Sequence, residues 1–113
     1  MAELIPEKDV KQEMQDIGVD EWATNYMLDK SKFRIIKIKD VRNAIANILK
    51  QEMLSIGGDV AVNKGCVNCS IEKSDILIMG TIRQLNKLIN KMKNQVSESK
   101  EIAIKIEKIL SEE

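Results

Sequence analysis

The stretch FRIIKIKDVRNAIANILKQEMLSIGGDVAV, residues 33–62, decides the fold. Residues 33–38 alternate well enough between two faces to predict a strand. Asp40 suits the N-cap of a long helix, because apolar residues then recur with a period near 3.6 as far as Gly57, which predicts a left-handed stop. A second strand is expected over residues 59–62. Strand, helix and strand in this order predict a βαβ unit with a right-handed parallel crossover.

Residues 75–79, Asp-Ile-Leu-Ile-Met, are apolar on both faces. This composition predicts a middle strand that helices cover on both sides. Thr81 and Gln84 then fit a capping box, in which each side chain satisfies a backbone amide at the start of the next helix. Residues 63–74 are ambiguous, because their alternation favours an edge strand while their length also permits a loop with one helical turn.

Helical segments are expected at both ends of the chain. Pro6 predicts the first turn of a helix that stops at Gly18, and Asp20 can cap a second helix. Trp22 and Tyr26 stand one turn apart in that second helix. A last helix is expected to begin at Ser97 or Ser99.

The sequence therefore predicts an α/β fold. We expect a small three- to four-stranded sheet, mostly parallel or mixed, flanked by helices and built on the βαβ unit. A length of 113 residues suits one domain, since domains typically hold about 100 to 150 residues. Within it, residues 1–30 should form an acidic helical segment, residues 33–95 the core, and residues 97–113 a C-terminal helix.

Composition excludes several classes of function. Eighteen basic residues balance eighteen acidic ones, so no net field favours nucleic acid or an anionic membrane. The chain has no histidine, which removes the commonest metal ligand and the usual acid–base group near neutral pH. No apolar stretch is long enough to span a membrane and the N-terminus lacks a signal-peptide pattern, so we expect a cytoplasmic protein. No nucleotide-binding loop motif occurs, and no cofactor is predicted.

Cys66 and Cys69 form the one motif of reactive type. Two sulfurs at this spacing can close a small disulfide or bind one edge of a zinc ion. A structural zinc site needs four ligands, so carboxylates or a second subunit would have to complete it. A thiol or metal module is one reading of the pair; ordinary half-buried side chains are the other.

Two strand ends are candidate ligand sites. The Gly80-Thr81 junction, with Arg83 nearby, could hold a phosphate or carboxylate, although capping alone also accounts for Thr81. The loop Asn63-Lys64-Gly65 follows a predicted strand, where parallel sheets bind ligands, although Asn and Gly there also suit a plain turn. Lys64 is expected to lie near the junction. No residue is predicted to be catalytic.

Residues 46–65, ANILKQEMLSIGGDVAVNKG, resemble the N-terminal extension that precedes the barrel in many archaeal and bacterial dihydropteroate synthases. Residues 70–81, SIEKSDILIMGT, together with Gln84 and the helix after it, are similar to the second half of the same extension. Upstream, residues 17–20 and the strand at Phe33 look like its opening. The resemblance covers most of the chain.

The resemblance implies a limited function. In that family the condensation of a pterin diphosphate with p-aminobenzoate belongs to a TIM barrel, and these 113 residues contain none of it. After Gln95 fused members tend to run Pro-Phe-Gly-Leu, whereas this chain has Val-Ser-Glu-Ser over residues 96–99. It looks like a free-standing version. The resemblance therefore implies an accessory or regulatory domain in pterin metabolism, which associates with a dihydropteroate synthase barrel or with a second copy of itself; the alternative is a domain that binds a small molecule or anion.

Overall fold

The computed structural model describes residues 1–95 and 97–113. Val96, the first residue of the expected departure from the family pattern, lies outside the described residues. The described part contains strands β1 (Phe33–Arg42), β2 (Asp59–Ala61) and β3 (Lys73–Thr81), and helices α1 (Val10–Ile17), α2 (Glu21–Ser31), α3 (Asn43–Ile56), α4 (Ile82–Lys93) and α5 (Ser97–Ser111). Short 3₁₀ helices lie at Glu7–Asp9 and Lys64–Cys66.

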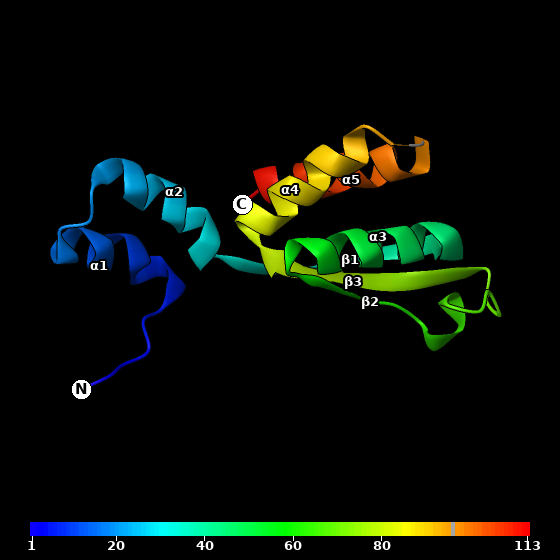
Figure 1. Cartoon of the computed structure of the whole chain (residues 1–113), viewed down its shortest axis with the longest axis horizontal. Helices are drawn as coiled ribbons and strands as arrows, with labels where there is room; N and C mark the ends of the chain where they lie inside the picture. Colours follow the sequence, from blue (N-terminus) through cyan, green and yellow to red (C-terminus); the bar gives the residue numbers. More distant parts are fainter. Residues whose placement is uncertain (96) are drawn as a thin grey trace.

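The sheet has three strands in the order β1-β3-β2 (Figure 1). Ile36 of β1 and Val60 of β2 both pair with Ile78 of β3, and both pairings are antiparallel. The predicted α/β class and helical ends are confirmed. The expected parallel neighbours are not formed, because β3 inserts between β1 and β2 and runs against both. β1 and β2, which precede and follow α3 in the sequence, still run parallel to each other. The βαβ unit is therefore present, but β3 separates its two strands.

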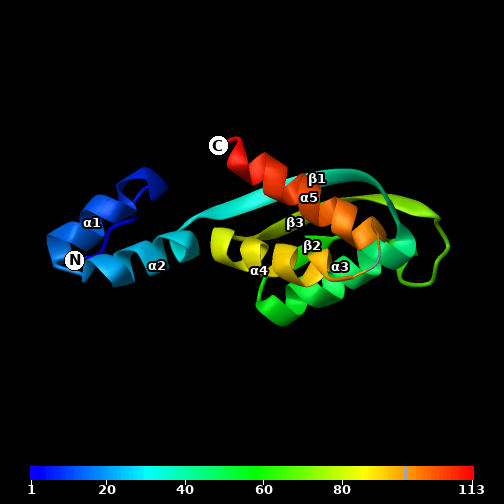
Figure 2. The same ribbon diagram turned by 90° about the horizontal axis from the view of Figure 1, so that it is seen from above.

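Helices cover one face of this sheet. Figure 1 shows α3, α4 and α5 on the same side of the strands, and Figure 2 shows the three lying across that face. Along β3, Ile76 and Ile78 are buried under the helices whereas Leu77 is 39% exposed on the opposite face. The expectation of helices on both faces is therefore wrong, because α1 and α2 extend beyond the end of the sheet instead of underneath it.

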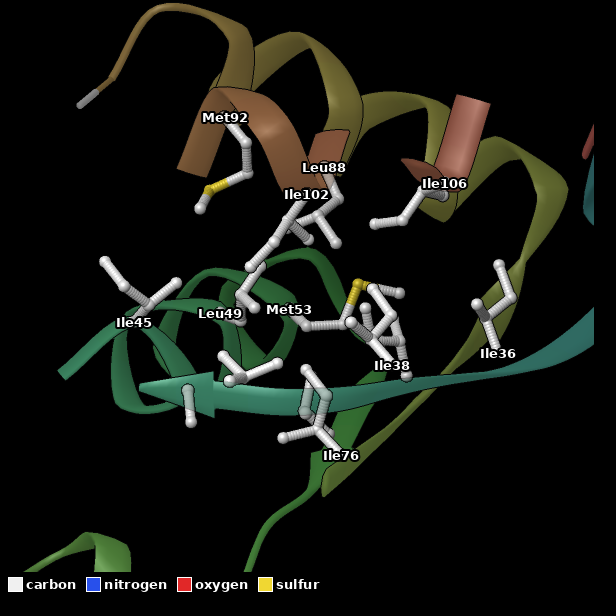
Figure 3. Close-up of a cluster of buried hydrophobic side chains, with 14 of the residues drawn as sticks. Ile36, Ile38, Ile45, Leu49, Met53, Ile76, Leu88, Met92, Ile102 and Ile106 are labelled. Atoms are coloured by element: carbon white, nitrogen blue, oxygen red, sulfur yellow. The ribbon is translucent and has the colours of Figure 1, made fainter. Parts of the chain in front are cut away.

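The core lies between the sheet and these three helices (Figure 3). Leu49 and Met53 of α3 are fully buried at its centre. Strand residues close the core from one side and residues of α4 and α5 from the other, which joins all three layers into one cluster. Its buried apolar members are Ile36, Ile38, Val41, Ile45, Ala46, Leu49, Met53, Val60, Cys66, Ile76, Ile78, Leu85, Leu88, Ile89, Met92, Ile102, Ala103 and Ile106.

Asp40 is not the N-cap of α3. It lies inside β1 at a break in the register between Ile38 and Val41, with a positive φ of 55°, and its N–H donates to Asp75 Oδ1 at 3.0 Å. This bulge allows the strand to continue so that Val41 is buried. The helix therefore begins only at Asn43, whose N–H donates to the backbone oxygen of Glu72.

The edge strand expected within residues 63–74 does not form. The chain instead makes the 3₁₀ helix Lys64–Cys66 and a turn in which Cys69 has a positive φ of 58°. The Ser70 N–H donates to the backbone oxygen of Gly65 at 2.9 Å. The alternative interpretation, a loop with one helical turn, is the correct one, because local backbone bonds satisfy this segment without a strand partner.

The predicted end of α3 and the predicted start of α4 are confirmed. Gly57 ends α3 with a φ of 108°, a left-handed conformation that favours glycine. At the start of α4, Thr81 Oγ1 accepts from the Gln84 N–H at 3.1 Å, while Gln84 Oε1 accepts from the Thr81 N–H at 2.9 Å. Both halves of the expected capping box are therefore present.

The first 32 residues form an arm that projects from the core (Figures 1 and 2). No residue of α1 is buried, and within α2 only Thr24 is. The molecule measures 52 × 31 × 24 Å, and its radius of gyration of 16.4 Å exceeds the roughly 13 Å expected of a compact chain of this size. The division of the chain into an arm, a core and a last helix as parts of one domain stays a prediction.

A charged cluster ties this arm to the core. The Arg34 guanidinium donates from Nη1 to Glu7 Oε1 and from Nε to Glu113 Oε1, both at 2.6 Å. Hydrogen bonding from Arg34 holds the pKa of the Glu7 carboxyl below its usual value, and the carboxylates raise the pKa of Arg34. One side chain of β1 thus fixes both terminal segments.

We expect acid to release the arm. Because the pKa of Glu7 is lower in the folded protein than in the unfolded chain, this carboxylate stabilises the fold fully above its unfolded pKa. That stability is lost as the pH falls through the lowered, folded pKa. Small-angle scattering should show the radius of gyration rising over this acid range, and Glu7→Gln should show the rise already at pH 7. Glu13→Gln on α1 is the control; equal radii for all three proteins at pH 7 would contradict this role.

Candidate functional sites

The Asn63-Lys64-Gly65 loop follows β2 and is held by its own polar groups. Asn63 Oδ1 accepts from the Gly65 N–H at 2.8 Å, and the Asn63 N–H donates to Ser74 Oγ at 3.1 Å. Lys64 is exposed and Gly65 is buried. The Asn63 oxygen therefore caps a short 3₁₀ turn. A plain turn was the alternative to ligand binding that the sequence allowed for this loop.

Cys66 and Cys69 lie in different surroundings. Cys66 is fully buried in the core, whereas Cys69 is exposed in the turn, and both are free thiols. Asn47 Nδ2 donates to the backbone oxygen of Cys66 at 2.9 Å, which fixes the turn against α3. Across residues 1–95 and 97–113, no three His, Cys, Asp or Glu side chains gather as a metal ion would need.

The two candidate ligand loops do not form one site. β2 and β3 are antiparallel, with Asp59 opposite Met79 and Ala61 opposite Leu77. The segment after Ala61 therefore lies at the opposite end of the sheet from Gly80 and Thr81. Lys64 is not a neighbour of the Gly80-Thr81 junction, contrary to the expectation that rested on parallel strands.

The Gly80-Thr81 junction opens instead on a hollow of ≈ 430 Å³. Thr81 and Arg83 belong to its wall, as does the half-buried Ile56 at the end of α3. Helices α2 and α4 supply the remaining residues, because α2 packs beside the first turns of α4. The wall consists of Tyr26, Lys30, Ile56, Thr81, Arg83, Gln84 and Lys87. Three of these side chains are cationic and none is acidic.

Tyr26 organises the cations of this hollow. The Arg83 Cζ atom lies 4.3 Å from the centre of the Tyr26 ring, and the Lys30 Nζ atom lies 4.7 Å from it. The ring is itself stacked on Trp22, with centroids 5.6 Å apart. A cation near an aromatic face is attracted by the negative charge of the ring face, so Tyr26 helps to position both cations.

The face of the sheet away from the helices is apolar at its centre. Phe33 and Ile35 of β1 are 54% and 62% exposed there, and Leu77 of β3 lies in the next row. Register places Ile35 opposite Met79, and Leu77 between Lys37 and Ala61. We call this surface, made of Phe33, Ile35, Ala61, Leu77 and Met79, the open sheet face.

Charges border the open sheet face. Lys37 Nζ lies 3.9 Å from Asp75 Oδ2, and Lys50 Nζ donates to Asp59 Oδ1 at 3.0 Å. The bond from Lys50 also holds the pKa of the Asp59 carboxyl below its usual value. An apolar centre inside a charged rim is the anatomy of a protein interface.

One curated protein is similar over most of the chain. Over 86 residues it is 30% identical to the bifunctional dihydropteroate synthase/dihydropteroate reductase of Helicobacter pylori. The match covers 76% of this chain and 23% of that protein's length. No family model matches, and no solved structure matches. The similarity supports the relation to dihydropteroate synthases predicted from residues 46–65; that the matched part is an N-terminal extension stays a prediction.

Sequence reasoning found part of these surfaces. It singled out Thr81 and Arg83, but Lys30 and Lys87 reach the same hollow only because α2 packs on α4. The spacing of Trp22, Tyr26 and Lys30, four residues apart each time, places them on one helix face and was the available signal.

Within the described ranges, no helix is long and apolar enough to cross a membrane.

Proposed function

We propose that this chain is a non-catalytic association domain, which docks through its open sheet face on an enzyme of the dihydropteroate synthase type. The observation that carries the proposal is the exposed apolar surface of Phe33, Ile35 and Leu77 on a sheet whose other face is fully covered. The chain has no histidine, and its role in pterin metabolism would be that of an accessory or regulatory subunit.

The energetic argument rests on the open sheet face. Burying one fully exposed large apolar side chain contributes about 1.5–3 kcal/mol, and Phe33, Ile35 and Leu77 are 39–62% exposed, so covering each would supply roughly half of that contribution. Soluble antiparallel sheets with a solvated face usually carry polar residues there. Here the polar residues Lys37 and Asp75 stand at the border instead, where they would remain hydrated around a docked partner.

The nature of the partner follows from the curated relative. Its printed name gives a dihydropteroate synthase, and the segment similar to this chain is 23% of its length. In that protein, therefore, a segment of this kind and a much longer remainder belong to one polypeptide. A segment of this kind would contact the synthase part through a surface that can close against it, and the open sheet face is the surface we propose for this contact.

The test is light-scattering size-exclusion chromatography of the full chain, alone and with the dihydropteroate synthase of its own organism. We expect a complex with the summed mass. Ile35→Asp puts a charge at the centre of the face and should weaken the complex about 100-fold, which corresponds to nearly 3 kcal/mol. Ile104→Asp, at an exposed position of α5, is the matched control and should leave the complex unchanged.

Two results would overturn this proposal. Independent elution of both proteins at micromolar concentrations would exclude a useful complex. A homodimer of the chain alone, lost in Ile35→Asp and indifferent to the synthase, would assign the open sheet face to a second copy. Circular dichroism and thermal unfolding of Ile35→Asp are the folding control. If both are unchanged, a loss of binding by this variant is not caused by unfolding.

A further inference from the structure

The hollow between α2 and α4 gathers positive charge that the described residues do not neutralise. Lys30, Arg83 and Lys87 line it, and none of the three forms an ion pair with any residue in 1–95 or 97–113. Elsewhere on the molecule several basic side chains have acidic partners within 4 Å. These are Arg34, Lys37, Arg42, Lys50, Lys91 and Lys93.

We propose that this hollow binds the phosphate group of a small phosphorylated ligand. Arg83 and Lys30 are both drawn to the Tyr26 ring, so two of the three cations are already positioned at distances of 4.3 and 4.7 Å from one point. An anion bound in the hollow would reduce the repulsion among its three like charges. A guanidinium offers a planar fork of donors that matches phosphate oxygens, and lysine adds a mobile point charge.

The start of α4 strengthens the same hollow. Its twelve residues align their peptide dipoles so that partial positive charge collects at the N-terminus, beside Thr81. Thr81 Oγ1 accepts a hydrogen bond from the Gln84 N–H, which leaves the hydroxyl proton available to a ligand oxygen. The helix dipole and the Thr81 hydroxyl therefore add to the three cations that line the hollow.

The dimensions favour a small ligand over a polymer. A volume of ≈ 430 Å³ lies within the roughly 300–1,000 Å³ of small-molecule sites and exceeds what a single phosphate needs. Ile56 supplies an apolar wall for the organic part. One turn beyond Lys87, Lys91 is bound to Glu52 at 3.1 Å, so the uncompensated charge ends there. An extended polyanion would find no continuing basic track along α4.

The experiment is isothermal titration of the full chain with phenyl phosphate at constant ionic strength. We expect saturable one-to-one binding. Removing a charged hydrogen bond loses about tenfold in affinity, so Arg83→Gln and Lys87→Gln should each weaken binding by about that factor. Lys100→Gln, the same charge change at an exposed position of α5, should leave the dissociation constant unchanged. Lys87→Gln keeps the test decisive if losing the contact between Arg83 and Tyr26 loosens α2.

Three outcomes would overturn the proposal. The first is absence of saturable heat at millimolar phenyl phosphate. The second is equal weakening by Lys100→Gln, which would mean attraction to net charge alone. The third is tighter binding of a single-stranded oligonucleotide that Arg83→Gln and Lys87→Gln weaken, which would make the occupant of the hollow a polymer. Ile35→Asp should retain the ligand, so failure here is distinguishable from failure of the docking proposal.

Discussion

Leu49→Ala is expected to lower the free energy of unfolding by about 3–5 kcal/mol, the cost of removing a buried leucine and leaving a cavity. Leu49 is fully buried, and it lies where α3 meets both the strands and the α4–α5 pair (Figure 3). Collapse around the gap is limited, because residues from three layers would have to move together. Small domains have only about 5–15 kcal/mol of stability, so this change consumes a large share.

Urea unfolding followed by circular dichroism measures this effect. The midpoint should fall while the slope of free energy against urea stays the same, which would show that the unfolded state is unaffected. Leu54→Ala is the matched control on the same helix, because Leu54 is exposed and its truncation should change stability by less than about 1 kcal/mol. Equal losses in the two variants would contradict the placement of α3 over the sheet.

Gly80→Ala is expected to destabilise the fold by about 1–2 kcal/mol, in the lower part of the range for an overpacked core, because the atom that must move most is the end of the flexible Met53 side chain. Gly80 faces the helices from β3, and a Cβ atom there would overlap the Cε atom of Met53 and press on Gln84. Gln84 cannot easily move away, because its side chain completes the capping box of α4. Because Gly80 has no side chain, the end of the Met53 side chain can occupy the space beside it.

A double-mutant cycle tests this explanation. Met53→Ala alone should cost about 2–5 kcal/mol through the cavity it leaves. In the double variant the new methyl group enters that cavity, so its loss should be smaller than the sum of the two single losses by about 1 kcal/mol or more. Strict additivity would mean that Met53 and Gly80 do not share the same space.

Local sequence signals predicted local structure correctly. Gly57 ends α3, and Thr81 with Gln84 caps α4, because each signal acts on backbone groups within a few residues. The same kind of signal failed at Asp40. The preference of Asp for an N-cap stabilises the fold less than the burial of Val41, which requires β1 to continue past Asp40. Tertiary packing decided that boundary.

Strand order could not be read from the sequence in the same way. Residues 75–79 are apolar on both faces, and the sequence does not distinguish an apolar side chain that a helix covers from one that is left exposed. Leu77 is of the exposed kind. The antiparallel insertion of β3 also separated the Asn63 loop from Thr81, so the two candidate ligand positions became opposite ends of one sheet.

The central place of β3 also has a consequence for biosynthesis. Neither β1 nor β2 has its hydrogen-bonding partner until residues 73–81 have left the ribosome. A nascent chain that ends at β2 would carry two unpaired strands and an uncovered α3, which is the kind of species that aggregates or recruits chaperones. Folding of the sheet should therefore wait until β3 has been synthesised, and truncations before Thr81 should yield no partly folded core.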